Sequence, residues 1–226
     1  SLPWWPGPNA TLVDVGAGLH SGEADKAHVA EVLQRWGCGP GSVVLAFEPD
    51  MAARKRAKRA VRRVLGAGCS ITWFAAAVSN VNGSRARLRG SGNGASISAA
   101  VPAETRAPQY QEWGVEVETV TLDAVAEERG LKRIDLLKVD AEGHDFAVLQ
   151  GARNLLRAGR VVLLVWELGA NLNDLYYANW VAKVWCVRRR SAWCFGRCPC
   201  TASMRFGVVF LSVCARGRLR WLSVCG

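Results

Sequence analysis

A dense group of polar residues follows one largely apolar segment of the sequence. Residues 134–137 read Ile-Asp-Leu-Leu, and residues 138–145 read Lys-Val-Asp-Ala-Glu-Gly-His-Asp. Polar side chains directly behind a buried strand are costly to bury unless they are paired or functional. Asp140, or His144 with its ordinary pKa near neutrality, is suited to taking a proton from a hydroxyl nucleophile. The structural alternative is that these acids lie at a helix N-terminus, where the helix dipole favours negative charge. This alternative explains Asp145 better than it explains the whole group.

Two further segments end in residues suited to binding a ligand. The first ends Asp14-Val-Gly16-Ala-Gly18, where glycines let the backbone approach a ligand and a helix start offers free N–H groups. A structural tight turn explains the two glycines equally well. The second ends at Glu48, a carboxylate that can accept hydrogen bonds from both hydroxyls of an adenosine ribose. A solvated acid or a helix cap is the alternative for Glu48.

A further carboxylate, Glu167, follows the apolar residues 161–166 and is expected at the same edge of the sheet. An acid that merely ends a strand explains Glu167 as well as a site role does. A divalent metal held by Asp140, Glu142 and Glu167 would be another way to acidify a hydroxyl. We rank this below direct base catalysis, because acids at helix starts need no metal, and we expect no metal site.

The elements that must position these residues alternate between strand and helix. Short apolar runs predict strands, and apolar residues three or four apart predict helices. Strands that alternate with helices pair in parallel, so we expect a doubly wound α/β domain with a mostly parallel sheet and helices on both faces. Such sheets bind ligands at the carboxyl ends of their strands. The expected strands are 10–18 with its glycine turn, 42–50, 71–78, 116–121 at a sheet edge, 134–140 and 160–167; the expected helices are 24–36, 51–65, 122–129 and 146–157, with hairpins and a long loop over 80–108.

The order of these segments resembles the FkbM-type family of S-adenosylmethionine-dependent methyltransferases. Residues 134–152 look like the family's hallmark strand, turn and helix. Four other segments are similar to the family's remaining blocks in the same order, namely 13–18, 46–49, 76–80 and 120–123. The resemblance covers residues 10–170. It implies a class I methyltransferase, whose Rossmann-like sheet holds the cofactor over its first strands.

The resemblance also implies roles for individual residues. Those that match the cofactor-binding pattern of the family are Asp14, Gly16, Gly18, Glu48, Ala77, Val78 and Asp140. The first three would form the loop around the methionine part of S-adenosylmethionine, Glu48 would hold the ribose, and the turn at 77–78 would lie near the adenine. Asp140 would face the reacting end, with Glu142 and His144 beside it as further candidate catalytic residues. The family's small-molecule members are mostly O-methyltransferases, so the expected acceptor is a hydroxyl of a small molecule or a glycan.

Charge and cysteine are distributed unevenly along the chain. The formal net charge is +10, but residues 1–174 hold 20 Lys and Arg against all 19 Asp and Glu, a net of +1. Residues 175–226 hold nine Lys and Arg, no acid and six of the eight Cys. We therefore expect a methyltransferase domain over 1–174 and an atypical basic tail over 175–226.

Three interpretations of the tail compete. Cys194, Cys198 and Cys200 are candidate zinc ligands, although their spacing lacks paired C-x-x-C units. A basic arm with Trp193 or Trp221 would bind RNA or DNA through phosphate contacts and stacking. The absence of acids over 52 residues fits best a segment that is not under selection, such as a shifted or unspliced reading frame. In that case the sheet would be incomplete at its C-terminal side, and nucleic acid is not the favoured partner.

We expect an enzyme that uses S-adenosylmethionine, and two alternatives remain. One is an RNA-directed methyltransferase that uses the basic tail, and the other is a degenerate or truncated homologue without turnover. A nicotinamide-dependent dehydrogenase is a distant interpretation, because Glu48 lies 30 residues beyond Gly18, against about 20 in that fingerprint. Every apolar run is far shorter than the ~20 residues of a membrane helix, so no membrane span is expected. The chain begins with Ser1 rather than Met, which leaves a lost leader peptide open.

Overall fold

The main sheet of the protein has five parallel strands at its centre. The computed structural model describes residues 8–18, 39–64, 69–89, 96–98, 114–168 and three short strands between residues 207 and 224. The parallel strands follow the order β3-β2-β1-β8-β9. Their bounds are β1 (Thr11–Val15), β2 (Ser42–Phe47), β3 (Cys69–Phe74), β8 (Ile134–Val139) and β9 (Val161–Leu168). The expected parallel sheet is therefore confirmed.

Three short strands near the end of the chain extend this sheet beyond β9. Strands β10 (Gly207–Val209) and β11 (Leu211–Ser212) each pair antiparallel with β9. Strand β12 (Ser223–Val224) pairs antiparallel with β10. The basic tail thus contributes backbone pairing to the same sheet.

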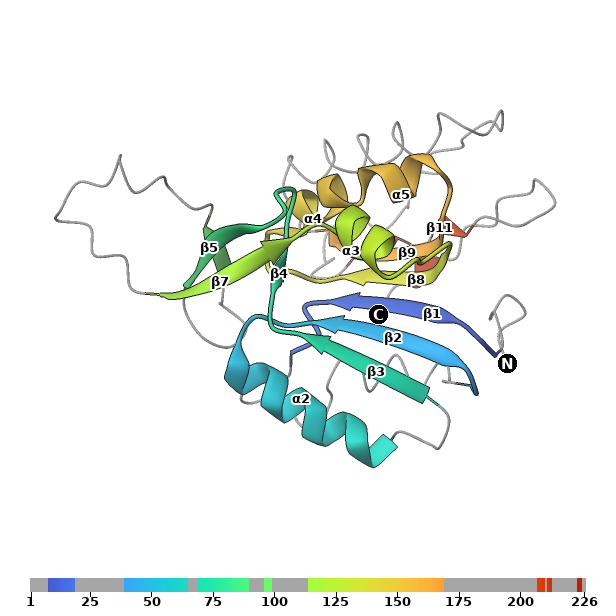
Figure 1. Ribbon diagram of the computed structural model, residues 1–226, viewed down its shortest axis with the longest axis horizontal. Helices are drawn as coiled ribbons and strands as arrows, with labels where there is room; N and C mark the ends of the chain where they lie inside the picture. The colour runs from blue at the N-terminus through green and yellow to red at the C-terminus, as the bar shows by residue number, and fades with distance from the viewer. Residues whose placement is uncertain are drawn as a thin grey trace, which may run out of the picture.

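The chain winds in opposite directions from the middle of the sheet. Helix α2 (Met51–Val64) joins β2 to β3, whereas α4 (Asp145–Gly151) and α5 (Arg153–Arg157) join β8 to β9 on the other side of β1. Because such crossovers are right-handed, opposite directions place α2 and the α4–α5 pair on opposite faces of the sheet. Figure 1 shows α2 below the strands and α4 and α5 above them. The doubly wound architecture is confirmed, and its winding reverses between β1 and β8.

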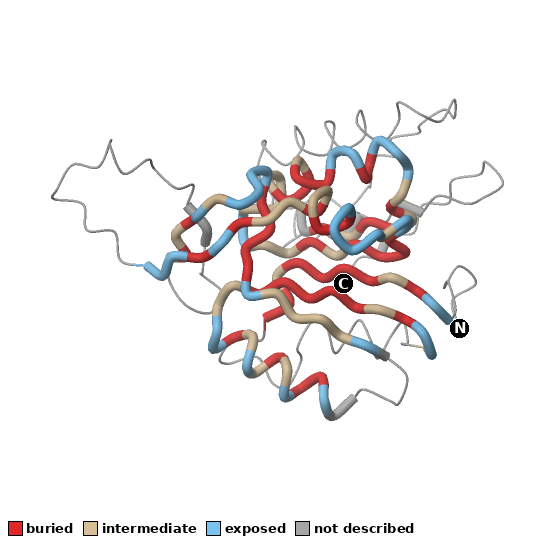
Figure 2. Tube along the Cα trace, in the orientation of Figure 1, coloured by how far each residue is buried: buried red, intermediate tan, exposed pale blue. Residues whose placement is uncertain are grey.

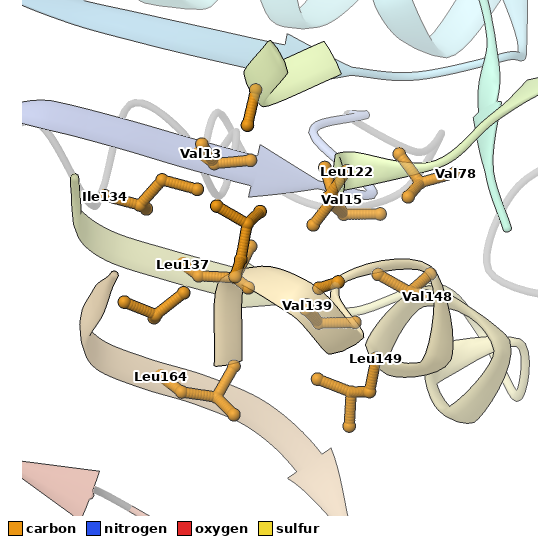
Figure 3. Packing of buried hydrophobic residues seen from close by; sticks show 14 of the residues in the cluster. Val13, Val15, Val78, Leu122, Ile134, Leu137, Val139, Val148, Leu149 and Leu164 are labelled. Carbon is orange, nitrogen blue, oxygen red and sulfur yellow. The ribbon is translucent and has the colours of Figure 1, made fainter. Parts of the chain in front are cut away.

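One hydrophobic core fills the face of the sheet that α4, α5 and α3 (Leu122–Glu128) cover. Successive side chains of a strand point to opposite faces, so the core members from β1 and from β2 are two residues apart. They pack against Leu122 of α3 and against Val148 and Leu149 of α4 (Figure 3). The central strands are accordingly buried along most of their length (Figure 2). The strand residues in the core are Val13, Val15, Leu45, Phe47, Val78, Ile134, Leu137, Val139, Val161, Leu164 and Trp166.

A second, smaller sheet follows β3 and corrects two expectations. Its order is β4-β7-β5-β6, with bounds β4 (Ala77–Val78), β5 (Ser84–Arg89), β6 (Ser96–Ser98) and β7 (Val115–Val120). The single strand expected over 71–78 is wrong, because the chain leaves the main sheet after Phe74 and enters the second sheet at Ala77. The edge position expected for 116–121 is also wrong, since β7 pairs with both β4 and β5.

The helices differ from expectation in their local detail. Helix α2 buries mainly alanines, Ala53, Ala57 and Ala60, whose small side chains let its backbone approach the sheet closely. The single helix expected over 146–157 is interrupted at Ala152, which separates α4 from α5. At the start of α5, the Asp123 carboxylate of α3 accepts hydrogen bonds from two α5 backbone N–H groups, at 2.8 and 2.9 Å. The helix expected over 24–36 lies outside the described residues. No described helix has the length and apolar character needed to cross a membrane.

Leu137 offers a direct test of this core. Its side chain is 0% exposed and lies in register with Val13 of β1 and Leu164 of β9. Leu137→Ala is expected to lower the free energy of unfolding by about 2–5 kcal/mol, through lost burial and the cavity left behind. The measurement is urea unfolding, with Val115→Ala, at a position 68% exposed, as the control expected to change stability by less than about 0.5 kcal/mol. A loss below about 1 kcal/mol for Leu137→Ala would contradict this packing.

Candidate functional site

Three charged side chains meet where the winding of the sheet reverses. Asp14 near the end of β1 lies in register with Lys138 near the end of β8. The Lys138 ammonium donates to Asp14 Oδ1 at 3.4 Å and to Asp140 Oδ2 at 3.3 Å. Asp14 is 2% exposed, and Asp140 is partly buried. The structure thus brings together the two predicted carboxylates, and one lysine joins them.

The charge of this cluster is set by its pairing. Burial acts to lower the pKa of Lys138, but the carboxylates of Asp14 and Asp140 outweigh burial and raise it. Lys138 therefore remains an ammonium at neutral pH. Because two carboxylates surround one cation, the cluster has a net negative charge that suits a positively charged ligand.

The loop after β1 packs directly against the start of the turn after β8. Gly16 has a φ of +78°, and a Cβ at this position would overlap the Asp140 carbonyl. The Gly16 and Ala17 N–H groups both donate to the Phe47 carbonyl at 3.0 Å, and the Asp140 N–H donates to the Val15 carbonyl at 3.1 Å. Only glycine satisfies both the backbone angle and the close approach at position 16.

Gly18 and Glu48 form a second close contact between β1 and β2. A Cβ on Gly18 would overlap Glu48 Oε2 and crowd the Ala53 Cβ at 3.1 Å. The Glu48 carboxylate is 5% exposed, and its Oε1 accepts from the Asp50 N–H at 2.8 Å. Both residues were predicted as ligand-binding, and the structure places the carboxylate directly over the glycine backbone. The alternative of a helix cap at Glu48 does not hold, because the cap is Asp50, whose Oδ1 accepts from Ala52 N–H and Ala53 N–H.

Burial changes the ionisation of Glu48. It raises the pKa of the carboxyl from 4.5 to about 7, whereas the hydrogen bond from Asp50 acts in the opposite direction. A smaller upward effect comes from the negative charges of Asp50 and Asp14. A carboxyl with a pKa near neutrality is characteristic of functional sites, although structural networks also produce such shifts.

The turn between β8 and α4 has an unusual backbone that its own acid stabilises. Glu142 has a φ of +49° and Gly143 a φ of +87°, and a left-handed conformation is uncommon for a residue with a side chain. Asp145 Oδ1 accepts from the Ala141 N–H, and Oδ2 accepts from the Gly143 N–H, each at 3.1 Å. Asp145 therefore holds this turn as a helix-start acid, as expected, while Glu142 is exposed at its tip.

His144 contacts a residue that the sequence did not single out. Its Nε2 lies 3.0 Å from the hydroxyl of Ser79, which follows β4 and is 6% exposed. Burial lowers the pKa of His144, and the Asp145 carboxylate partly offsets that effect. His144 is therefore neutral at physiological pH and can accept a proton.

The remaining predicted residues divide into buried and undescribed ones. Ala77 and Val78 are 1% and 2% exposed, and Val78 packs in the main core with Val15 and Phe47. Their side chains serve the core, so contact with an adenine would involve their backbone. The side chain of Glu167 and the cysteines of the tail lie outside the described residues. Within the described ranges, no group of three His, Cys, Asp or Glu side chains is arranged to hold a metal ion.

Sequence reasoning missed Lys138 and Ser79 as members of the site. A signal existed for Lys138, because a lysine within a buried strand requires acidic partners and Asp140 lies two residues away on the same face. No comparable signal existed for Ser79, which is 65 residues from His144 in the chain. That contact depends on how the second sheet is placed against α4.

Comparisons with known proteins show the family of this chain and agree with its fold. The family model for the methyltransferase FkbM domain matches residues 14–179, most of the chain. The crystal structure of methyltransferase FkbM from Methylobacillus flagellatus KT is similar, with a TM-score of 0.50 and 16% sequence identity. That match covers 78% of this chain and 38% of the other, so the present chain spans well under half of the solved one. No curated protein gave a significant match.

The raised pKa of Glu48 predicts a pH-dependent stability. A carboxyl with a higher pKa in the folded state binds its proton more tightly there, so stability falls as pH rises from 4.5 to about 7. A shift of this size corresponds to roughly 3 kcal/mol at most. Glu48→Gln mimics the protonated acid and should therefore match the wild type near pH 4.5 but be more stable near pH 8.

The measurement is urea unfolding of both proteins across this pH range, from which the difference in unfolding free energy is taken at each pH. Glu118→Gln, at an exposed position of β7, is the matched control. A stability difference between Glu48→Gln and the wild type that does not grow as pH rises would contradict the burial of an ionisable Glu48.

Proposed function

Because the chain belongs to the FkbM methyltransferase family, we propose that it transfers a methyl group from S-adenosylmethionine to an oxygen of its acceptor. Methyltransferases of this family generally use S-adenosylmethionine. The proposed acceptor is a hydroxyl of a sugar, of another small molecule or of a lipid-linked glycan. The observation that carries the proposal is the arrangement of closely packed glycines and of the carboxylates of Asp14, Glu48 and Asp140 at the carboxyl ends of β1, β2 and β8.

The residues at this edge fit the proposed cofactor. Gly18 is buried against the Glu48 carboxylate, and because any Cβ there would displace that carboxylate, the glycine fixes its position at this edge. Among the described residues Glu48 Oε2 accepts no hydrogen bond, so the carboxylate retains capacity for two ribose hydroxyls. The net negative charge of the Asp14, Lys138 and Asp140 cluster suits the sulfonium and amino groups of the cofactor. These observations support the binding roles proposed for Asp14, Gly16, Gly18, Glu48 and Asp140.

In the proposed reaction the protein aligns the acceptor hydroxyl with the methyl group and removes the hydroxyl proton. S-adenosylmethionine supplies an activated methyl group that is transferred from its sulfur to the acceptor oxygen. The protein must exclude water, orient the hydroxyl and accept its proton. Asp140 and His144 are the proposed bases, and Glu142 is a further candidate at the tip of the same turn. Of the three, His144 carries no salt bridge among the described residues, and burial keeps it neutral.

The division of the chain at residue 174 is also a proposal. Its support is the balanced charge before this point and the absence of acids after it. The pairing of β10 and β11 with β9 means that residues beyond 174 complete the antiparallel side of the sheet. We therefore propose that the tail acts as part of the fold rather than as an RNA-binding arm.

Calorimetric titration with S-adenosylmethionine tests the cofactor proposal. Glu48→Ala is expected to weaken binding by about 5- to 150-fold, equivalent to about 1–3 kcal/mol for a lost hydrogen bond to a charged group. Glu118→Ala, at an exposed position of the second sheet, is the matched control and should bind like the wild type. Hydroxyl donors favour the ionised carboxylate, so wild-type affinity should also rise as pH increases toward and above 7.

Two outcomes would count against the proposal. If the folded wild type binds no S-adenosylmethionine, the chain is a homologue that has lost the cofactor, and the active-enzyme proposal fails. If binding is equal in the wild type and in Glu48→Ala, the cofactor lies elsewhere and the assigned ribose contact is wrong.

A further inference from the structure

A chain of four polar side chains runs from His144 to α4 across the boundary between the two sheets. His144 Nε2 lies 3.0 Å from Ser79 Oγ, and the Ser79 hydroxyl donates to Asn80 Oδ1 at 3.3 Å. Asn80 Nδ2 in turn donates to Gln150 Oε1 at 3.2 Å. Gln150 belongs to α4, the helix that begins directly after His144. This series of hydrogen bonds therefore connects the imidazole of His144 to α4, the helix that it precedes, through the two residues that follow β4 of the second sheet.

The direction of these hydrogen bonds determines which nitrogen of His144 carries the proton. A hydroxyl has a single proton, and we assign that of Ser79 to Asn80 Oδ1, the acceptor end of an amide whose Nδ2 donates to Gln150. The Ser79 oxygen can then only accept from the imidazole. Its partner Nε2 must therefore bear the hydrogen, and in the neutral ring the lone pair lies on Nδ1.

The position of His144 at the start of α4 leaves Nδ1 available. A side chain at this position often accepts a hydrogen bond from the first turn of the helix. The His144 side chain makes no such bond, and the Ala141 and Gly143 N–H groups of the preceding turn are satisfied by Asp145. Among the described residues, no donor occupies Nδ1.

We propose that Ser79 is a positioning residue that holds His144 in the Nε2–H form, so that Nδ1 is the atom that accepts the proton of the methyl acceptor. The role of Nδ1 rests on the proposed function, whereas the tautomer does not. The proton leaves the acceptor hydroxyl as its oxygen bonds to the transferred methyl group, and it is held on Nδ1. The resulting imidazolium keeps its Nε2–H hydrogen bond to Ser79. Nδ1 therefore accepts the proton without any change of the proton on Nε2.

Ser79 is itself held firmly enough for this role. Its N–H donates to the Val120 carbonyl of β7 at 2.8 Å. Its carbonyl faces Gly151 of α4 so closely that a Cβ on that glycine would overlap it. The backbone of Ser79 is thus fixed by β7 on one side and by α4 on the other. Among the described residues, the charge that acts on the imidazole is that of the Asp145 carboxylate, which raises the pKa of the ring and partly offsets burial.

Nuclear magnetic resonance of the full chain labelled with ¹⁵N-histidine tests the proposal without cofactor or acceptor. The chain contains three histidines, and the signals absent from His144→Gln identify His144. At pH 8 we expect the wild-type ring in the Nε2–H form, with a ring proton protected from exchange with water. In Ser79→Ala this proton should exchange at least about tenfold faster, because its acceptor is lost. The matched control is Ser84→Ala, which replaces the first residue of β5 and should leave the His144 signals unchanged.

Two results would overturn the proposal. One is a wild-type ring that carries its proton on Nδ1, which can be read from the wild type even if Ser79→Ala does not fold. The other is an Nε2–H proton whose exchange is unchanged in folded Ser79→Ala. The calorimetric titration separates this inference from the proposed function: an Nε2–H ring in a chain that binds no S-adenosylmethionine would leave the tautomer assigned and remove the methyl transfer.

Discussion

The Lys138 ammonium between Asp14 and Asp140 is the interaction on which the carboxyl edge of the sheet depends. It joins β1 to β8 at the point where the winding reverses, between the buried Asp14 and the partly buried Asp140. Without the lysine, two carboxylates would face each other there at a large desolvation cost. Without the carboxylates, a buried ammonium would favour its neutral form. The cluster thus fixes both the geometry and the charge of this edge.

The site has two sides, which are built by different kinds of contact. On one side, close backbone approaches at Gly16 and Gly18 bring the β1 loop against Asp140 and Glu48. On the other side, Ser79 of the second sheet meets His144 at the start of α4. Val78 links the two by packing among the strand ends from which the site residues emerge. The second sheet is therefore part of how the edge is built.

Much of the architecture could be predicted from the sequence, because buried parallel strands produce continuous apolar runs. The positions of Asp14, Glu48 and Asp140 at strand ends follow from the same pattern. The switch of the chain from β3 to β4 could not be predicted, since residues 73–78 are apolar throughout and nothing marks the break at residues 75–76. The pairing of Ser79 with His144 could not be predicted either, because it depends on tertiary placement of β4. The inner face of α2 consists of Val61 and of Ala53, Ala57 and Ala60, and alanines are too weakly apolar to mark a buried face in a sequence.

Cofactor binding at the carboxyl edge of β1, β2 and β8 is the central proposal for this protein. A crystal structure of the chain with S-adenosylhomocysteine would test it. We expect ribose hydroxyls within hydrogen-bonding distance of Glu48, the amino acid part of the ligand over residues 14–18, and the Asp14, Lys138 and Asp140 cluster intact. A ligand bound at another place, or one whose ribose does not contact Glu48, would contradict it.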